Sequence, residues 1–101
     1  MNKVYLIGNL TKDVELSETS SGIKVARFTV AVPRKYEKDT TDFFNIVAWR
    51  VLADNCANYL KKGSKCAVVG SLQNRSYEAS DGTKRYTTEI VADEVEFLTS
   101  K

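Results

Sequence analysis

The sequence contains no histidine, one proline, one tryptophan and only two cysteines among its 101 residues. Nine residues separate Cys56 from Cys66, which is not the clustered spacing of a four-ligand structural zinc site. We therefore expect neither a metal nor another cofactor. The two cysteines could form one disulfide, but no feature of the sequence marks a secreted protein. Two small buried thiols are therefore the favoured interpretation.

Long apolar runs are also missing, so we expect no segment that spans a membrane and no membrane partner. The first residues, Met1 to Lys3, lead directly into a strand pattern without the apolar segment of a secretory signal. A cytoplasmic location follows. The net charge of +2 is too small to indicate a partner. The basic residues nevertheless gather near loops and aromatic residues, and this local clustering can form a basic face.

The hydrophobic pattern predicts an all-β domain. Alternating apolar residues indicate strands over 4–10, 24–32, 43–51, 65–77 and 85–98, and a helical pattern covers 52–60. Gly8 predicts a bulge or tight bend. The segment Lys61-Lys62-Gly63 is expected to end the helix, with lysines in the last turn and glycine at the cap. Five strands with one helix between the third and the fourth indicate a five-stranded oligonucleotide-binding (OB) barrel whose helix closes one end.

Two large rings on one strand are the most informative feature of the chain. Side chains alternate between the two faces of a strand, so Phe43, Asn45, Val47 and Trp49 should share one face. The opposite face, with Phe44, Ile46 and Ala48, is sufficient for a core. Exposed rings beside cations are typical of surfaces that stack nucleic-acid bases. Burial of Trp49 in the core is the alternative, but its face also carries Asn45, and asparagine is seldom buried without hydrogen-bond partners.

Further side chains are candidates for the same binding surface. Tyr36 lies in a basic loop, and Tyr77 ends the fourth strand on the face of Gln73 and Arg75. The predicted stacking residues are therefore Tyr36, Phe43, Trp49 and Tyr77. The predicted backbone and polar contacts are Arg34, Lys35, Arg50, Lys61, Lys62, Lys65, Gln73, Arg75, Lys84 and Arg85. Several of them have a simpler interpretation: Tyr36 and Tyr77 as surface tyrosines, Lys61, Lys62 and Lys65 as helix-ending lysines, and Lys84 and Arg85 as solubilising charges on a hairpin.

Several segments together resemble the bacterial single-stranded DNA-binding protein family of the replicative type. They include Gly8-Asn9-Leu10-Thr11-Lys12-Asp13, Thr41-Asp42-Phe43, Asn45-Ile46-Val47-Ala48-Trp49, Tyr59-Leu60-Lys61-Lys62-Gly63-Ser64 and Gly82-Thr83-Lys84-Arg85-Tyr86-Thr87-Thr88-Glu89. The resemblance implies an OB fold, a homotetramer and sequence-tolerant binding of single-stranded DNA during replication, recombination and repair, close to the nucleoid. It also implies base stacking at Tyr36, Phe43, Trp49 and Tyr77, although better-known members carry tryptophan at several of these positions.

The sequence departs from the family pattern at two places. Val14 follows Asp13 where the family commonly has proline, a change expected to affect only a loop. We expect a DNA-binding domain over 1–98 and a short tail over 99–101. Family members normally continue into a linker and an acidic tip that recruits replication and repair proteins, and the sequence ends before such a tip. Tail-mediated recruitment is therefore not expected of these 101 residues.

Two other classes of function compete with DNA binding. A protein-interaction module of a replication assembly, without strong DNA binding, would use the same rings as interface anchors. A nuclease could use Asp93, Glu94 and Glu96, but the chain has no histidine, and no serine or cysteine lies beside a plausible base. A solvated strand edge is the better interpretation of these carboxylates, so we expect a binding protein and not an enzyme.

Overall fold

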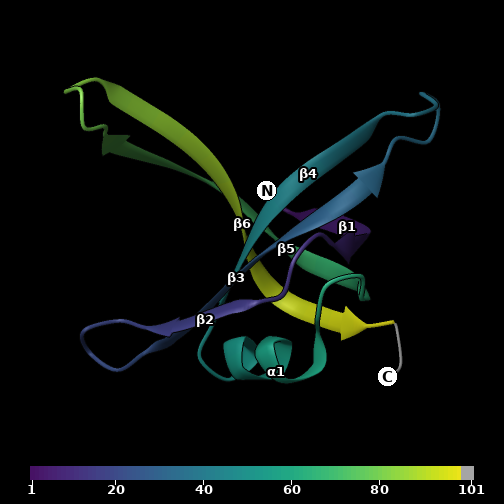
Figure 1. The fold of residues 1–101 in the computed structure, drawn as a ribbon, viewed down its shortest axis with the longest axis horizontal. Coiled ribbons are helices and arrows are strands. Elements are labelled where there is room, and N and C mark those ends of the chain that lie inside the picture. Colours follow the sequence, from purple (N-terminus) through teal and green to yellow (C-terminus); the bar gives the residue numbers. More distant parts are fainter. Residues whose placement is uncertain (99–101) are drawn as a thin grey trace.

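The computed structural model describes residues 1–98, and the expected tail at 99–101 lies outside the described residues. The described chain forms six strands and one helix (Figure 1). In chain order these are β1 (Val4–Leu10), β2 (Glu15–Glu18), β3 (Lys24–Pro33), β4 (Thr41–Trp49), α1 (Val51–Tyr59), β5 (Lys65–Glu78) and β6 (Lys84–Phe97). The expectation of a mostly β fold with one helix before the second long hairpin is confirmed.

Five of the strands close into a ring. Hydrogen-bonded neighbours follow the order β1-β5-β6-β4-β3, and the pairing of Asn9 with Ala31 joins β1 back to β3. All these pairings are antiparallel except the contact of β4 with β6, which consists of the pairs Ile46–Ile90 and Val47–Val91. Because this parallel contact is so short, the β3–β4 and β5–β6 hairpins separate beyond it and project as two arms (Figure 1).

β2 is a strand that the sequence pattern did not predict. It pairs with the first half of β3, from Glu15 opposite Arg27 to Glu18 opposite Lys24. All four of its residues are exposed. A strand without a buried face has no alternation of apolar and polar residues, so periodicity cannot reveal it.

The apolar core fills the ring, and the helix covers its lower end. Fully buried core residues include Val30, Ile46, Val68 and Ile90, and the helix contributes Ala53 and Cys56. The helix begins and ends one residue earlier than predicted. Leu60 is already extended, so the two lysines that follow lie outside the last helical turn. The predicted cap is wrong for this reason, and Gly63 instead donates its N–H to the Leu10 carbonyl at 2.9 Å.

Both cysteines are free and completely buried, which excludes the disulfide alternative. Burial raises the pKa of the Cys56 thiol to about 12, and the neighbouring Cys66 adds to this shift. Burial also raises the pKa of Cys66 to about 11. The thiols are therefore neutral near pH 7 and act as small apolar groups in the core.

Glycine marks two places where backbones approach closely. A Cβ at Gly8 would lie 2.5 Å from the Ala31 carbonyl oxygen, at the point where β1 meets β3. Pairing of β1 with β5 remains regular through Gly8, so this glycine serves a close approach rather than the predicted bulge. The irregular pairing lies between Val69 and Gly70, and a Cβ at Gly70 would lie 2.2 Å from the Val91 carbonyl oxygen.

Candidate nucleic-acid interface

The outward face of β4 carries the two rings that the sequence singled out. Phe43 is 64% exposed and Trp49 is 37% exposed. Between them Asn45 is also exposed, and its Oδ1 accepts a hydrogen bond from the Thr29 hydroxyl at 3.1 Å. Trp49 lies opposite Val25 on β3, and Val25 is buried. Phe43 is therefore a surface ring, whereas Trp49 is partly packed against the protein.

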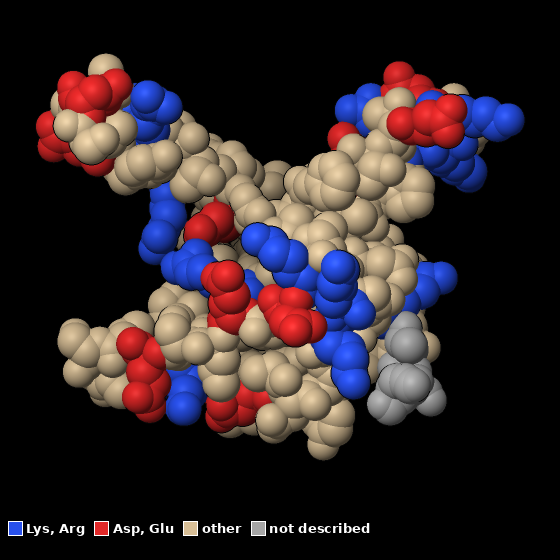
Figure 2. All heavy atoms as spheres, viewed as in Figure 1, with Lys and Arg blue, Asp and Glu red and all other residues tan. Residues whose placement is uncertain are grey.

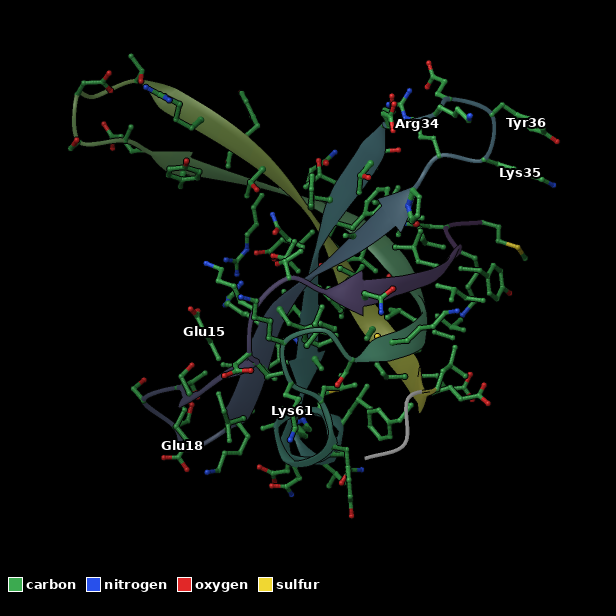
Figure 3. All side chains as sticks on the ribbon, turned by 45° about the vertical axis from the view of Figure 1, so that its right-hand side comes forward. Glu15, Glu18, Arg34, Lys35, Tyr36 and Lys61 are labelled. Atoms are coloured by element: carbon green, nitrogen blue, oxygen red, sulfur yellow. The ribbon has the colours of Figure 1, made fainter. Side chains whose placement is uncertain are left out.

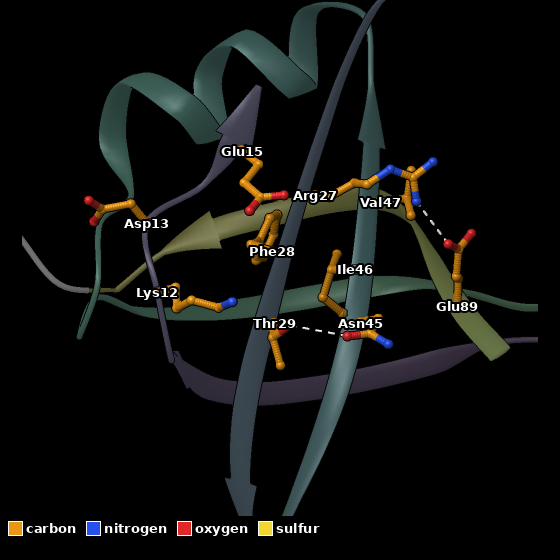
Figure 4. Close-up of a pocket in the computed structure, with 10 residues that line it drawn as sticks. All are labelled: Lys12, Asp13, Glu15, Arg27, Phe28, Thr29, Asn45, Ile46, Val47 and Glu89. Carbon is orange, nitrogen blue, oxygen red and sulfur yellow. Dashed lines mark hydrogen bonds and ion pairs between the residues drawn. The ribbon is translucent and has the colours of Figure 1, made fainter. Parts of the chain in front are cut away.

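Val47 departs from the predicted alternation. It shares the face of Phe43 and Trp49, yet it is only 2% exposed. The cause is an ion pair that crosses β4 at this residue, in which Arg27 Nη1 on β3 lies 2.8 Å from Glu89 Oε2 on β6 (Figure 4). Sequence alternation could not anticipate this cover, because the two partners are 62 residues apart in the chain.

Glu89 also joins the outward faces of the two arms. Its other carboxylate oxygen lies 3.7 Å from Arg75 Nε on β5. In the β5–β6 pairing, Gln73 lies opposite Glu89 and Tyr77 lies opposite Arg85, and side chains of directly opposed residues share a face. Arg27 belongs to the face of Phe43 and Trp49 in the same way. The faces that carry Phe43, Trp49 and Tyr77 therefore meet at Glu89.

The tip of the β3–β4 arm carries the predicted basic loop (Figure 3). Tyr36 is 88% exposed, and the Lys35 ammonium lies 5.4 Å from the centre of its ring, a cation–π distance. Arg34 donates to both Asp42 carboxylate oxygens at 2.9 and 3.0 Å and also to Glu37. These bonds from the guanidinium lower the pKa of Asp42. Arg34 thus fastens the base of the loop, whereas Lys35 and Tyr36 are presented to solvent.

The tip of the β5–β6 arm carries Tyr77, which is 54% exposed. The turn between the strands is held by Asp81, which accepts hydrogen bonds from the Thr83 backbone N–H and hydroxyl at 3.0 and 2.7 Å. Arg85 shares the face of Tyr77 and lies 3.5 Å from Asp81. Lys84 lies opposite Glu78, one position along, and therefore projects from the other face of the arm.

The remaining predicted cations do not lie on the joined faces of the arms. Lys61 and Lys62 follow the helix, and Figure 3 places Lys61 at the helical end of the molecule, far from the loop with Tyr36. Lys65 begins β5 beside the end of β6, where its carbonyl accepts the Leu98 N–H at 2.9 Å. Arg50 follows Trp49 directly and has a left-handed backbone with φ of 62°. Of these four, only Arg50 adjoins a predicted stacking ring.

A cavity of about 270 Å³ lies beside β3 and β4, between these strands and the segment 12–15, and reaches Glu89 of β6 (Figure 4); Asp13 and Glu15 also line it. Its lining includes four residues that the site prediction missed or used only as pattern partners: Lys12, Arg27, Asn45 and Glu89. Arg27 carried a usable signal, because it alternates with Ala26 and Phe28 and must point away from the core. No pattern in the sequence indicated Lys12 or Glu89 as part of the site, because their neighbours in space come from other strands.

Charge on this side of the molecule is mixed. Figure 2 shows Lys and Arg side chains interspersed with carboxylates across the middle of the face and at both arm tips. Four arginines, Arg27, Arg34, Arg75 and Arg85, each lie within 4 Å of a carboxylate oxygen. These four arginines are therefore held in ion pairs, and aromatic area is the more distinctive feature of the surface.

A small closed ring of strands with one capping helix and with rings and cations along two hairpins belongs to the oligonucleotide-binding class of folds. Comparison with known proteins identifies the family. The sequence matches the Single-strand binding protein family over residues 1–98. The chain belongs to this family, which confirms the resemblance noted in the sequence and the expectation of a binding protein rather than an enzyme.

Curated relatives give the same result. The chain is 54% identical over 102 residues to single-stranded DNA-binding protein 3 of Clostridium acetobutylicum, covering 97% of this chain and 71% of the relative. It is 50% identical over 105 residues to single-stranded DNA-binding protein 3 of Listeria innocua, covering 100% and 66%. It is 50% identical over 102 residues to the single-stranded DNA-binding protein of Bacillus cereus, covering 97% and 60%. The chain thus spans about two thirds of the length of these relatives.

Proposed function

We propose that the protein binds single-stranded DNA without strong sequence preference, and that it does so in replication, recombination and repair. The observation that carries this proposal is the exposure of Phe43, Trp49 and Tyr77 on faces that meet at Glu89, with Tyr36 at the tip of one arm. Family membership supports the same conclusion. Bases stack on such rings whatever their identity, because every base has a π-face.

The strand would follow the arms, with successive bases on the rings and phosphates beside cations. Trp49 lies six positions after Phe43 on β4, a distance of about 20 Å at the usual rise per residue in a strand. The rings are therefore spaced for several nucleotides rather than for one. Lys35, with its exposed position beside Tyr36, is the cation best placed for a phosphate contact at the arm tip.

Titration with oligo-dT tests the proposal directly. Trp49 is the only tryptophan, so its fluorescence reports on one site. We expect quenching on complex formation, and a log affinity that falls linearly with log salt because phosphate contacts release counterions. Unchanged fluorescence together with no complex at low salt would refute DNA binding and would favour the protein-interaction module.

We also propose that the chain forms a homotetramer and that the edge of β1 takes part. β1 presents Tyr5 and Ile7 to solvent, at 71% and 55% exposure. Within the described residues, β1 pairs along Val4–Asn9 with β5, whereas its other edge pairs with β3 only at Asn9 and Leu10. A free edge and an apolar face favour pairing with a second chain.

Light scattering tests this assembly. Ile7→Lys should lower the measured mass, because it places a charge on the exposed face of β1 without touching the core. A mass equal to one chain for the unmodified protein, or an unchanged assembly in the variant, would contradict the proposal.

We further propose that the protein acts in the cytoplasm, in association with the nucleoid. Within residues 1–98 no helix is long and apolar enough to cross a membrane.

A further inference from the structure

The ion-pair cluster at the junction of the two arms covers Val47 on its inner side, while its two arginines are partly exposed to solvent. Glu89 interacts with Arg27 from one arm and with Arg75 from the other, at 2.8 and 3.7 Å. Both arginines flank the path between Phe43 and Tyr77, and Arg27 also lines the polar cavity together with Lys12 and Asn45. A cluster at this place is positioned to meet any strand that passes from one arm to the other.

The three side chains differ in depth. The Glu89 side chain is only 14% exposed, whereas those of Arg27 and Arg75 are 41% and 55% exposed. The carboxylate therefore lies beneath the two guanidinium groups. A guanidinium has five N–H donors in a planar fork, and Arg27 donates to Glu89 through Nη1. Donors on the solvent side can bind a phosphate while the inner side still holds Glu89.

We propose that Arg27 and Arg75 contact the DNA backbone where the strand crosses between the arms, and that Glu89 is a positioning residue that orients both guanidinium groups for this contact. The inference rests on the proposed DNA binding and extends it to Arg27 and Glu89, which lie outside the predicted set, whereas Arg75 was already among the predicted backbone contacts. Lys12 adds a second cation on the far side of the same cavity.

The sign of the effect at Glu89 distinguishes positioning from simple charge. Glu89→Gln removes a negative charge from the DNA path, so an electrostatic effect alone would strengthen binding. If Glu89 positions the arginines, the same substitution weakens binding despite the more favourable charge. The matched control is Glu94→Gln, which makes the same change on the same strand, away from the cavity; it should leave the affinity unchanged or slightly raised.

Two substitutions of Arg27 test the contact itself. Arg27→Met keeps an unbranched stem over Val47 but removes the charge, and should lower the affinity about tenfold, as expected for a lost hydrogen bond to a charged group. It should also reduce the slope of log affinity against log salt by about 0.7, the value of one phosphate contact on a single strand. Arg27→Lys retains the charge but not the fork, so we expect only partial recovery.

Fluorescence anisotropy of labelled oligo-dT at four salt concentrations measures both quantities, and urea unfolding of each variant corrects for altered stability. Weaker binding of Glu89→Gln with a reduced salt slope for Arg27→Met supports the proposal. Tighter binding of Glu89→Gln, or wild-type affinity and slope for Arg27→Met, overturns it while DNA binding by the unmodified protein stands. Absence of DNA binding by the unmodified protein would instead refute the proposed function.

Discussion

Replacement of Phe43 by alanine should separate the effect on DNA binding from the effect on folding. The ring is 64% exposed, so about a third of its surface is in contact with the protein. An aromatic side chain can bury about 200 Å², so the contact amounts to about 70 Å². At about 25 cal/mol per Å² the substitution should cost less than about 2 kcal/mol of folding stability.

The expected loss of DNA affinity is larger in proportion. Stacking of a base on an aromatic ring contributes about 1–3 kcal/mol, which corresponds to about a 5- to 140-fold weaker complex. Anisotropy of labelled oligo-dT at fixed salt measures this loss, and quenching of Trp49 gives an independent reading in the same variant. Urea unfolding should show a variant that is still fully folded in the conditions of the assay.

Tyr86→Ala is the matched control. Tyr86 is 74% exposed on the β5–β6 arm, but it lies opposite Ser76 and therefore on the face away from Tyr77. Its removal should leave the affinity within about twofold of the wild type, because an unstacked surface ring contributes little. Wild-type affinity of Phe43→Ala, or an equal loss in Tyr86→Ala, would refute the assignment of the stacking face.

Two further predictions concern stability. Gly70→Ala should destabilise the protein by about 2 kcal/mol or more in urea unfolding, since its Cβ would lie 2.2 Å from the Val91 carbonyl oxygen and the backbone must shift; wild-type stability would contradict this. The pKa values of Cys56 and Cys66 are raised to about 12 and about 11 from 9.0, so their neutral forms stabilise the fold fully below pH 9, and this contribution is lost as the pH rises toward 11. Thermal unfolding from pH 8 to 10.5 should therefore show a falling midpoint, with a smaller fall when both cysteines are replaced by alanine.

Local periodicity was sufficient to predict the long strands and the helix. Alternation placed Phe43 on the exposed face of β4 and Ile46 in the core, and the structure agrees at both positions. It failed at Val47 because an ion pair between two other strands covers that residue. It also failed for β2, whose four residues are all exposed. In both cases the pattern of a strand reflects only the core beneath it. β2 has no buried face, and the side chains that cover Val47 come from other strands.

The sequence predicted which side chains of the candidate site share a face only where those side chains belong to the same hairpin. Tyr77 and Arg85 share a face because the turn at Gly82 sets their register, and the same register puts Lys84 on the other face. Alternation could have placed Arg27 on the outward face, but its pairing with Glu89 joins positions 62 residues apart and could not be predicted. Lys61 was included on charge alone, although the structure places it beside the helix. Composition identifies cations, but only the pairing of strands decides which of them face the rings.

The pairing of arginines with carboxylates shifts the expected balance between stacking and charge. Four of the five arginines lie within 4 Å of a carboxylate oxygen. A phosphate that binds such an arginine shares it with the carboxylate or displaces the carboxylate, and either event returns less free energy than contact with an unpaired cation. Stacking on the rings involves no such exchange. The affinity of this chain should therefore depend more on its four predicted stacking rings, and less on salt, than the number of cations around them would suggest.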